Sequence, residues 1–184
     1  MLFKETGFAG LLLFEPKVIG DSRGYFFESF NEKTFADYGL NAKFVQDNQS
    51  LSAYGVIRGL HFQKPPHAQT KLVRVLAGRI LDVVVDLRKD SATYGKHFTI
   101  ELSGQNKLQM LVPKGFAHGF SVLSESAEVL YKCDTLYNRE SEAGIMYNDP
   151  ELKINWNIPA DKAIISEKDL KHPSFKSYKA EFAV

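Results

Sequence analysis

Turn-forming residues interrupt the chain at short intervals, and this spacing restricts it to folds built from short strands. Apolar runs alternate with Gly, Pro, Asn, Asp and Ser at roughly the 8–12-residue spacing of all-β sandwiches and barrels. The runs Leu72–Leu76 and Ile80–Leu87, on either side of Ala77 and Gly78, indicate a hairpin. We therefore predict an all-β fold, either a sandwich or a barrel.

Two segments depart from this strand pattern. Asn31–Tyr38 is the best helix candidate, with Asn31 as its N-cap. Ala160–Leu170 fits a short helix or an ordered tail. The 184 residues lie within the size range of one domain, and no internal repeat divides them, so we expect a single domain over residues 1–184.

Composition and charge exclude several classes of function. Hydrophobic residues make up 44% of the chain and charged residues 24%, as in a soluble globular protein with a sizeable core. The net charge of +1 gives no general attraction to nucleic acid or to a membrane, so local cations must hold any anionic ligand. The apolar run Gly10–Phe14 is too short to span a bilayer. Because Cys133 is the only cysteine, no internal disulfide can form, and we expect a cytoplasmic protein.

Polar residues with acid–base chemistry interrupt the strand-like segments between residues 45 and 71. His61 is a candidate general base because an imidazole exchanges protons near neutral pH. Arg58 and Lys71 are cations beside apolar segments, and a buried cation needs a partner. That partner is either an anionic substrate or enolate, or a structural carboxylate such as Asp82 or Asp86. The residues alone leave both interpretations open.

Strand geometry sets a condition on this candidate site. In a regular strand the side chains of Arg58 and His61 would point to opposite faces. Gly59 lies between them and could form a β-bulge that turns both side chains inward. We predict such a bulge at Gly59.

Two later residues could belong to the same cavity. His118 follows the tight turn that Pro and Gly shape within Pro113–Gly119, and it is either a second cavity histidine or a core histidine. Tyr131 lies at the end of an apolar strand, where its phenol could return a proton to a carbanion. Most strand tyrosines only pack, so this role needs further support.

A further group of side chains could contact a nucleotide. Phe26, Tyr137 and Tyr147 could stack on a nucleobase, although aromatic residues are also common in sandwich cores. Arg23 and Glu28 flank an aromatic segment and could contact a ligand or a partner subunit, or remain solvated charges.

These residues resemble the dTDP-4-dehydrorhamnose 3,5-epimerase family, in order and over nearly the whole chain. The segments that carry the resemblance are Phe14–Lys17, Asp21–Ser29, Phe44–Asn48, Arg58–Gln63, Lys71–Arg74, Pro113–Gly119, Leu130–Lys132, Asn148–Pro150 and Ser166–Asp169. The resemblance implies a cupin-like jelly-roll β-sandwich with a few short helices. It also implies a homodimer that exchanges N-terminal strand material, and no metal or other cofactor.

The resemblance implies a role for each site residue. His61 would be the base, Asp169 the carboxylate that orients it, and Tyr131 the acid on the opposite face of the sugar. Arg58 and Lys71 would stabilise an enolate oxygen or bind the substrate. The remaining substrate-binding positions are Gln46, Asp47, Asn48, His118, Glu142 and Lys168, with Arg23 and Glu28 contacting the nucleotide sugar from the partner chain.

The implied reaction converts dTDP-4-dehydro-6-deoxy-D-glucose into dTDP-4-dehydro-L-rhamnose, on the way to an activated L-rhamnose for surface polysaccharide. The 4-keto group acidifies the protons at C3 and C5. A base removes one proton, and the negative charge moves to the C4 oxygen, where fixed cations stabilise it. Return of a proton from the opposite face inverts the carbon.

Three alternatives remain open. A related enzyme would invert only C3 or only C5 of a nucleotide 4-keto sugar. A metal-dependent cupin enzyme would use the Pro-x-Gly-x-x-His pattern that ends at His118, but the chain lacks a His-x-His pair with a following Glu, and the histidine nearest to His61 is His67. A non-catalytic sugar-binding sandwich would need neither His61 nor Tyr131.

Overall fold

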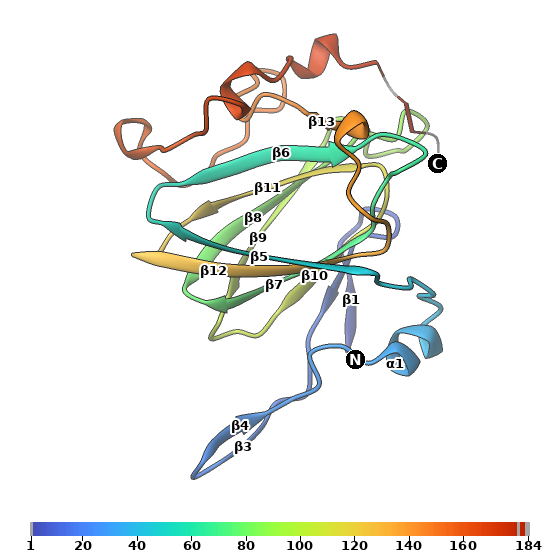
Figure 1. The fold of residues 1–184 in the computed structure, drawn as a ribbon, viewed down its shortest axis with the longest axis vertical. Helices are drawn as coiled ribbons and strands as arrows, with labels where there is room; N and C mark the ends of the chain where they lie inside the picture. The colour runs from blue at the N-terminus through green and yellow to red at the C-terminus, as the bar shows by residue number, and fades with distance from the viewer. Residues whose placement is uncertain (1, 180, 183–184) are drawn as a thin grey trace.

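Two antiparallel sheets pack face to face in the computed structural model, which describes residues 2–179 and 181–182 (Figure 1). The first sheet contains, in spatial order, β1 (Phe3–Glu5), β2 (Leu12–Phe14), β10 (Gln109–Val112), β7 (Lys71–Ala77), β12 (Ser126–Cys133) and β5 (Gln46–Ala53). The second contains β13 (Glu142–Gly144), β6 (Ile57–Gln63), β11 (Phe116–Val122), β8 (Arg79–Asp86) and β9 (His97–Ser103). The prediction of an all-β sandwich is confirmed.

The predicted hairpin around Gly78 is wrong, because β7 and β8 lie in different sheets. β7 pairs with β10 and β12, whereas β8 pairs with β9 and β11. Gly78 has a φ of 77°, and a Cβ there would lie 2.0 Å from the carbonyl oxygen of Ser126. The turn is therefore a tight crossover between sheets, and its residue types are the same ones that a hairpin turn uses.

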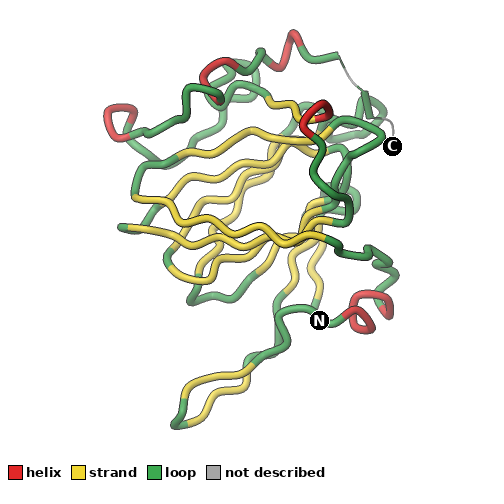
Figure 2. The backbone as a smooth tube through the Cα atoms, in the orientation of Figure 1, coloured by secondary structure: helices red, strands yellow, loops and turns green. Residues whose placement is uncertain are grey.

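Helices are few and short, as expected (Figure 2). The predicted helix is confirmed as α1 (Glu32–Asp37), and the side-chain oxygen of Asn31 caps it by accepting from the Thr34 backbone N–H at 3.3 Å. Short 3₁₀ turns make up the rest: η1 (Arg139–Ser141), η2 (Ala160–Lys162), η3 (Asp169–Lys171) and η4 (Phe175–Ser177). None of the described helices is long and apolar enough to cross a membrane.

A separate hairpin projects from the sandwich near the N-terminus (Figure 1). It consists of β3 (Ile19–Asp21) and β4 (Gly24–Phe26). Only a part of each apolar run beside Asp21 therefore forms a strand of this hairpin. Its large side chains face solvent, with Ile19 58%, Tyr25 60% and Phe26 67% exposed. Such an exposed apolar surface is typical of an interface with another molecule.

The inner strands of the second sheet are buried on both faces. Val84, Phe116 and Phe120 point into the core between the sheets, while Leu152 and Trp156 from the chain after β13 pack against the outer face of the second sheet. β8 is therefore buried at every position after Arg79 and does not alternate between buried and exposed, as expected for a strand covered on both sides. The same covering segment brings η3 against β6, which completes the site described next.

Candidate active site

A cavity of about 430 Å³ opens between the two sheets, where β5, β7 and β12 face β6 and β11. Most of the residues selected from the sequence line it, namely Gln46, Asn48, Arg58, His61, Lys71, His118, Tyr131 and Glu142. The sequence reasoning missed several polar neighbours in the same lining, including Gln49, Ser50, Gln63 and Gln69. Their amide and hydroxyl groups gave no chemical signal that distinguishes them from ordinary strand residues.

The predicted bulge at Gly59 is confirmed. β6 carries one extra residue against β11 between the register pairs His61–His118 and Arg58–Phe120. Gly59 has a φ of 125°, and a Cβ on it would lie 2.6 Å from the β11 backbone. Because the extra residue resets the alternation, Arg58 and His61 both line the cavity.

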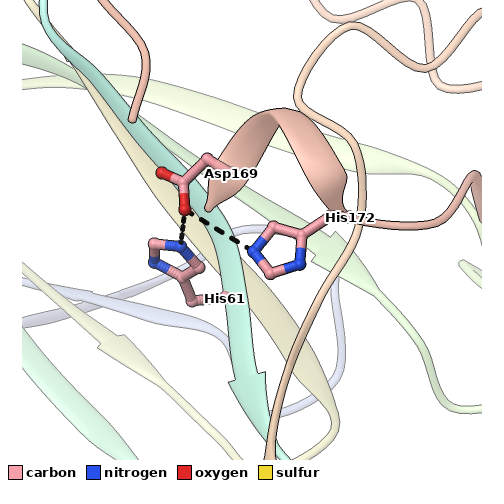
Figure 3. Close-up of side chains that lie close together, drawn as sticks. All are labelled: His61, Asp169 and His172. Carbon is pink, nitrogen blue, oxygen red and sulfur yellow. Dashed lines mark hydrogen bonds and ion pairs between the residues drawn. The ribbon is translucent and has the colours of Figure 1, made fainter. Parts of the chain in front are cut away.

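Asp169 orients the ring of His61 (Figure 3). The Nε2 atom of His61 lies 2.7 Å from Oδ1 of Asp169, and the Gly59 backbone N–H donates to Oδ2 at 3.3 Å. Burial alone would raise the pKa of Asp169, but the hydrogen bond and charge of His61, with the Gly59 N–H, outweigh it and lower that pKa. An ionised Asp169 holds the proton of neutral His61 on Nε2, which leaves the Nδ1 lone pair to act as a base.

His172 completes this group and was missed by the sequence reasoning (Figure 3). Its Nε2 lies 3.5 Å from the same Asp169 oxygen, and its ring lies 5.5 Å from the ring of His61 at an angle of 74°. Burial and the charge of His61 lower the pKa of His172. The only sequence signal was its position three residues after Asp169, a spacing that brings two side chains together on a helical turn.

His61, Asp169 and His172 each place one possible metal-ligand atom within 4.8 Å of the others. In the described part of the chain, this is the one group of side chains with a spacing that could suit a metal ion. Two nitrogen or oxygen ligands of a tetrahedral zinc ion are roughly 3.3 Å apart at ordinary bond lengths. The 2.7 Å between His61 and Asp169 is instead a hydrogen-bond distance. We therefore interpret the group as an acid–base pair with a neighbour.

A second histidine–carboxylate pair lies beside the first. Nε2 of His118 is 2.6 Å from Oδ1 of Asp82, and both side chains are buried. Asp86 instead binds Arg88. Neither carboxylate forms a hydrogen bond or ion pair with Arg58 or Lys71 in the described structure, so the two cavity cations have no structural carboxylate as a direct partner.

The wall opposite His61 carries an acid and a cation. The Lys71 ammonium lies 5.6 Å from the centre of the Tyr131 ring. Burial lowers the pKa of Lys71 and raises the pKa of Tyr131, so the phenol keeps its proton at neutral pH. Arg58, on the same strand as His61, donates from Nε to the Ser52 hydroxyl at 3.0 Å.

Polar and aromatic side chains surround the cavity mouth. Lys168 forms a 2.5 Å ion pair with Glu142, which also accepts from the hydroxyl of Tyr137 at 2.9 Å. Burial alone would raise the pKa of Glu142, but these two hydrogen bonds outweigh it and lower that pKa. Of the three candidate stacking residues, Tyr137 lines the cavity, whereas Phe26 lies on the projecting hairpin and Tyr147 packs against the core.

Four predicted substrate contacts lie outside the cavity lining, and one of them, Lys168, pairs with Glu142 at the cavity mouth. Asp47 points away from the cavity because side chains alternate along β5, and it binds Lys132 at 3.0 Å. Arg23 adjoins β4 of the projecting hairpin and pairs with Asp21 at 2.5 Å, and Glu28 follows that strand. The substrate contacts of all the assigned residues stay predictions, including those of Asp47, Arg23 and Glu28.

The arrangement can remove a proton next to a carbonyl group. A carboxylate-oriented imidazole lies on one wall, and a protonated phenol with an ammonium group lies on the other. The cations can stabilise the oxygen anion that forms when the carbon loses its proton. The phenol can then return a proton from the other side.

Comparisons with known proteins support this chemistry. A model of the dTDP-4-dehydrorhamnose 3,5-epimerase family matches residues 5–177. The Pseudomonas aeruginosa enzyme of that name is 52% identical over 166 residues, which cover 90% of this chain and 91% of that protein. The crystal structure of the Elizabethkingia anophelis enzyme is 55% identical, with a TM-score of 0.91 over 95% of this chain and 96% of that one.

A second solved structure contains a ligand. The Legionella pneumophila dTDP-6-deoxy-D-glucose-3,5-epimerase, in complex with dTDP-4-keto-L-rhamnose, is 46% identical to this chain, with a TM-score of 0.92 over 97% of this chain and 95% of that one. The expectation of a cupin-like jelly roll is confirmed by these structural matches. The chain therefore belongs to the dTDP-4-dehydrorhamnose 3,5-epimerase family and is an isomerase.

Proposed function

We propose that this chain converts dTDP-4-dehydro-6-deoxy-D-glucose into dTDP-4-dehydro-L-rhamnose by inverting C3 and C5. The observation that carries this proposal is the placement of His61 and Tyr131 on opposing walls of one cavity. Inversion requires that a proton leave from one face of the sugar and return to the other. A base and an acid on opposite walls meet that requirement.

In this mechanism His61 removes the proton through Nδ1, while Nε2 donates to Asp169. The carboxylate stabilises the imidazolium that results, because it stays ionised at neutral pH. Tyr131 then donates its phenolic proton to the opposite face of the carbon. Its raised pKa supports this role, because the phenol is protonated at neutral pH.

The charge that develops on the C4 oxygen needs fixed donors. Lys71 and Arg58 supply positive charge, and His118 offers a ring nitrogen locked by Asp82. A fixed donor of this kind is worth roughly 10²–10³ in rate. Among the described residues Lys71 forms no ion pair with a carboxylate, so an enolate would complete its environment better than any group now beside it.

We assign the nucleotide to the cavity mouth. Gln46, Asn48, Glu142 and Lys168 offer hydrogen-bonding groups there, and Tyr137 presents a half-exposed ring on which a nucleobase could stack. The diphosphate would be held by local cations, as the small net charge of the chain requires.

We further propose a homodimer in which the projecting hairpin contributes Arg23 and Glu28 to the partner's cavity. The hairpin stands away from its own cavity and exposes Ile19, Tyr25 and Phe26. Co-expression of His61→Asn chains with Arg23→Ala chains tests this. Each heterodimer would then contain one intact site, and the mixture should regain about one quarter of wild-type activity. No recovery above the activity of the single variants would contradict shared sites.

The cytoplasmic location stays a prediction, with the free buried Cys133 as its only support.

The reaction in D₂O distinguishes the candidate functions. The enzyme is incubated with dTDP-4-dehydro-6-deoxy-D-glucose and a downstream ketoreductase, and the product is analysed by NMR. Deuterium at both C3 and C5 supports the proposal, and deuterium at only one carbon indicates a single-centre epimerase. Binding without exchange indicates a sugar-binding protein, and loss of activity after chelation indicates a metal-dependent enzyme.

A further inference from the structure

His172 lies beside the His61–Asp169 pair, is largely shielded from solvent and does not line the substrate cavity. Its side chain is 11% exposed, and its Nε2 points at Oδ1 of Asp169 from 3.5 Å, the same oxygen that His61 contacts at 2.7 Å. Among the described residues this buried Nε2 has no well-aligned hydrogen-bond partner. Both imidazoles therefore face one carboxylate oxygen, and only His61 is at hydrogen-bond distance from it.

The fold provides a specific space for the His172 ring. Gly144 on β13 is the register partner of His61, and a Cβ on Gly144 would lie 2.5–2.6 Å from three atoms of the His172 ring. The chain after the ring is fixed by the backbone hydrogen bond from Met146 to Pro173 at 2.9 Å. Glycine is needed at 144 for this close approach and not for an unusual backbone conformation.

Burial favours the neutral form of His172, and the charges around the ring act in both directions, with Asp169 and Glu142 favouring the protonated form. The ring faces Asp169 on η3, His61 on β6, Glu142 on β13 and Lys168 just before η3. Burial and the charge of His61 lower the pKa of His172, so it is neutral at neutral pH. A neutral imidazole can donate one N–H to Asp169 without placing a positive charge opposite the imidazolium that forms on His61.

We propose that His172 is a positioning residue that holds the Asp169 carboxylate in the orientation at which His61 works as a base. This inference rests on the proposed function of His61. Because His172 acts through Asp169 and not on the substrate, its loss should change kcat and leave KM nearly unaltered. A displacement of about 1 Å at a catalytic group can cost on the order of 10²-fold in rate.

Four variants test the proposal. His172→Phe removes the N–H and should lower kcat by about 10–100-fold, with KM within about twofold. His172→Gln keeps an N–H near the position of Nε2 and should regain a large part of that loss. Gly144→Ala leaves the imidazole but displaces it, and should lower kcat in the same direction as His172→Phe. His97→Phe, on β9 at the far edge of the same sheet, should keep wild-type kcat.

The pH profile separates positioning from a structural role. In His172→Phe no second imidazole N–H faces the Asp169 oxygen, so the carboxylate should stabilise the imidazolium of His61 more strongly and the acidic limb of kcat/KM should move to higher pH. His172→Gln should leave this limb near its wild-type position. If His172→Phe and His172→Gln lose kcat equally, the acidic limb of kcat/KM does not move and Tm is lower, His172 has a structural role and the inference is overturned.

A parallel measurement of His61→Asn separates this inference from the proposed function. If His61→Asn retains wild-type turnover, the assignment of the base fails and the inference fails with it. If His61→Asn is inactive while His172→Phe keeps wild-type kcat and its acidic limb, only the role of His172 is overturned. An inactive His61→Asn together with the pattern expected for His172 supports both.

Discussion

Two histidine–carboxylate pairs lie side by side in the cavity, and their surroundings differ. His61 and His118 are register partners on β6 and β11, and each ring contacts a carboxylate at 2.6–2.7 Å. The His61 side chain is 34% exposed, whereas that of His118 is 7% exposed. An exposed imidazole can receive a proton from a ligand, while a buried one is better suited as a fixed hydrogen-bonding group.

The two carboxylates also come from different parts of the fold. Asp82 lies on β8, in the middle of the second sheet, and is buried with one oxygen unpartnered in the described structure. Asp169 lies on a 3₁₀ turn of the segment that covers the sheet, and it contacts two imidazoles and a backbone N–H. Similar residue pairs therefore acquire different chemistry from the burial of the imidazole and from the element that supplies the carboxylate.

The largest expected effect tests this difference directly. His61→Asn should lower kcat by about 10³-fold or more, because it removes the base, while dTDP binding stays nearly unchanged. His118→Asn should lower kcat by only about 10²-fold and raise KM, because it removes one fixed donor. Steady-state kinetics and calorimetric titration with dTDP measure both. Equal losses of kcat in the two variants would contradict the assignment of separate roles.

Asp169→Asn should have the next largest effect. The amide can donate to His61 and favour the wrong tautomer, so kcat should fall by roughly 10²–10³-fold. The folded-state pKa of Asp169 is lowered, so its carboxylate contributes stability that is complete above the unfolded pKa of about 3.9 and is lost as pH falls through the lower folded value.

Urea unfolding from pH 7 to pH 2 measures that contribution. The free energy of unfolding of the wild type should exceed that of Asp169→Asn at pH 7, and the gap should close below about pH 3.9. Asp161→Asn removes an exposed carboxylate and serves as the matched control, with no such gap expected. A gap that stays constant down to pH 2 would show that the Asp169 charge does not contribute.

Much of this site could be predicted from the sequence, but not all of it. Turn spacing predicted the all-β class, and the conflict between strand alternation and chemistry predicted the bulge at Gly59, because glycine permits both the φ and the close approach. The crossover at Gly78 could not be predicted, because turn residues do not specify which sheet the next strand joins. His172 could not be selected, because its role arises only when the covering segment packs on β6.

Lys71→Met comes third in expected size. Removing the ammonium should lower kcat by about 10²-fold. The folded-state pKa of Lys71 is lowered by burial, so the charged form destabilises the fold fully below that pKa, and this cost falls as pH rises above it and is gone above the unfolded value of about 10.4. The variant should therefore be more stable at pH 7, with a Tm about 2–4 °C higher.

Lys132→Met provides the control for Lys71→Met. Lys132 lies on β12 and pairs with Asp47 outside the cavity. Lys132→Met should therefore keep nearly wild-type kcat and should not raise Tm. In the wild type, activity should also decline at a pH below the ordinary lysine range of about 10.4, because the ammonium loses its proton earlier. A Tm that falls in Lys71→Met would contradict the burial cost assigned to this lysine.

The smallest expected effect separates the two faces of β5. Asn48 lines the cavity, so Asn48→Ala should raise KM by about tenfold, the equivalent of one lost hydrogen bond. Asp47 is its neighbour in the chain but points to the other face and binds Lys132, so Asp47→Ala should raise KM by no more than about threefold. Equal increases in KM would instead support the substrate contact that the family resemblance assigns to Asp47. That contact would then have to form on the outer face of the first sheet, which only a second chain or a rearranged strand could bring to the substrate.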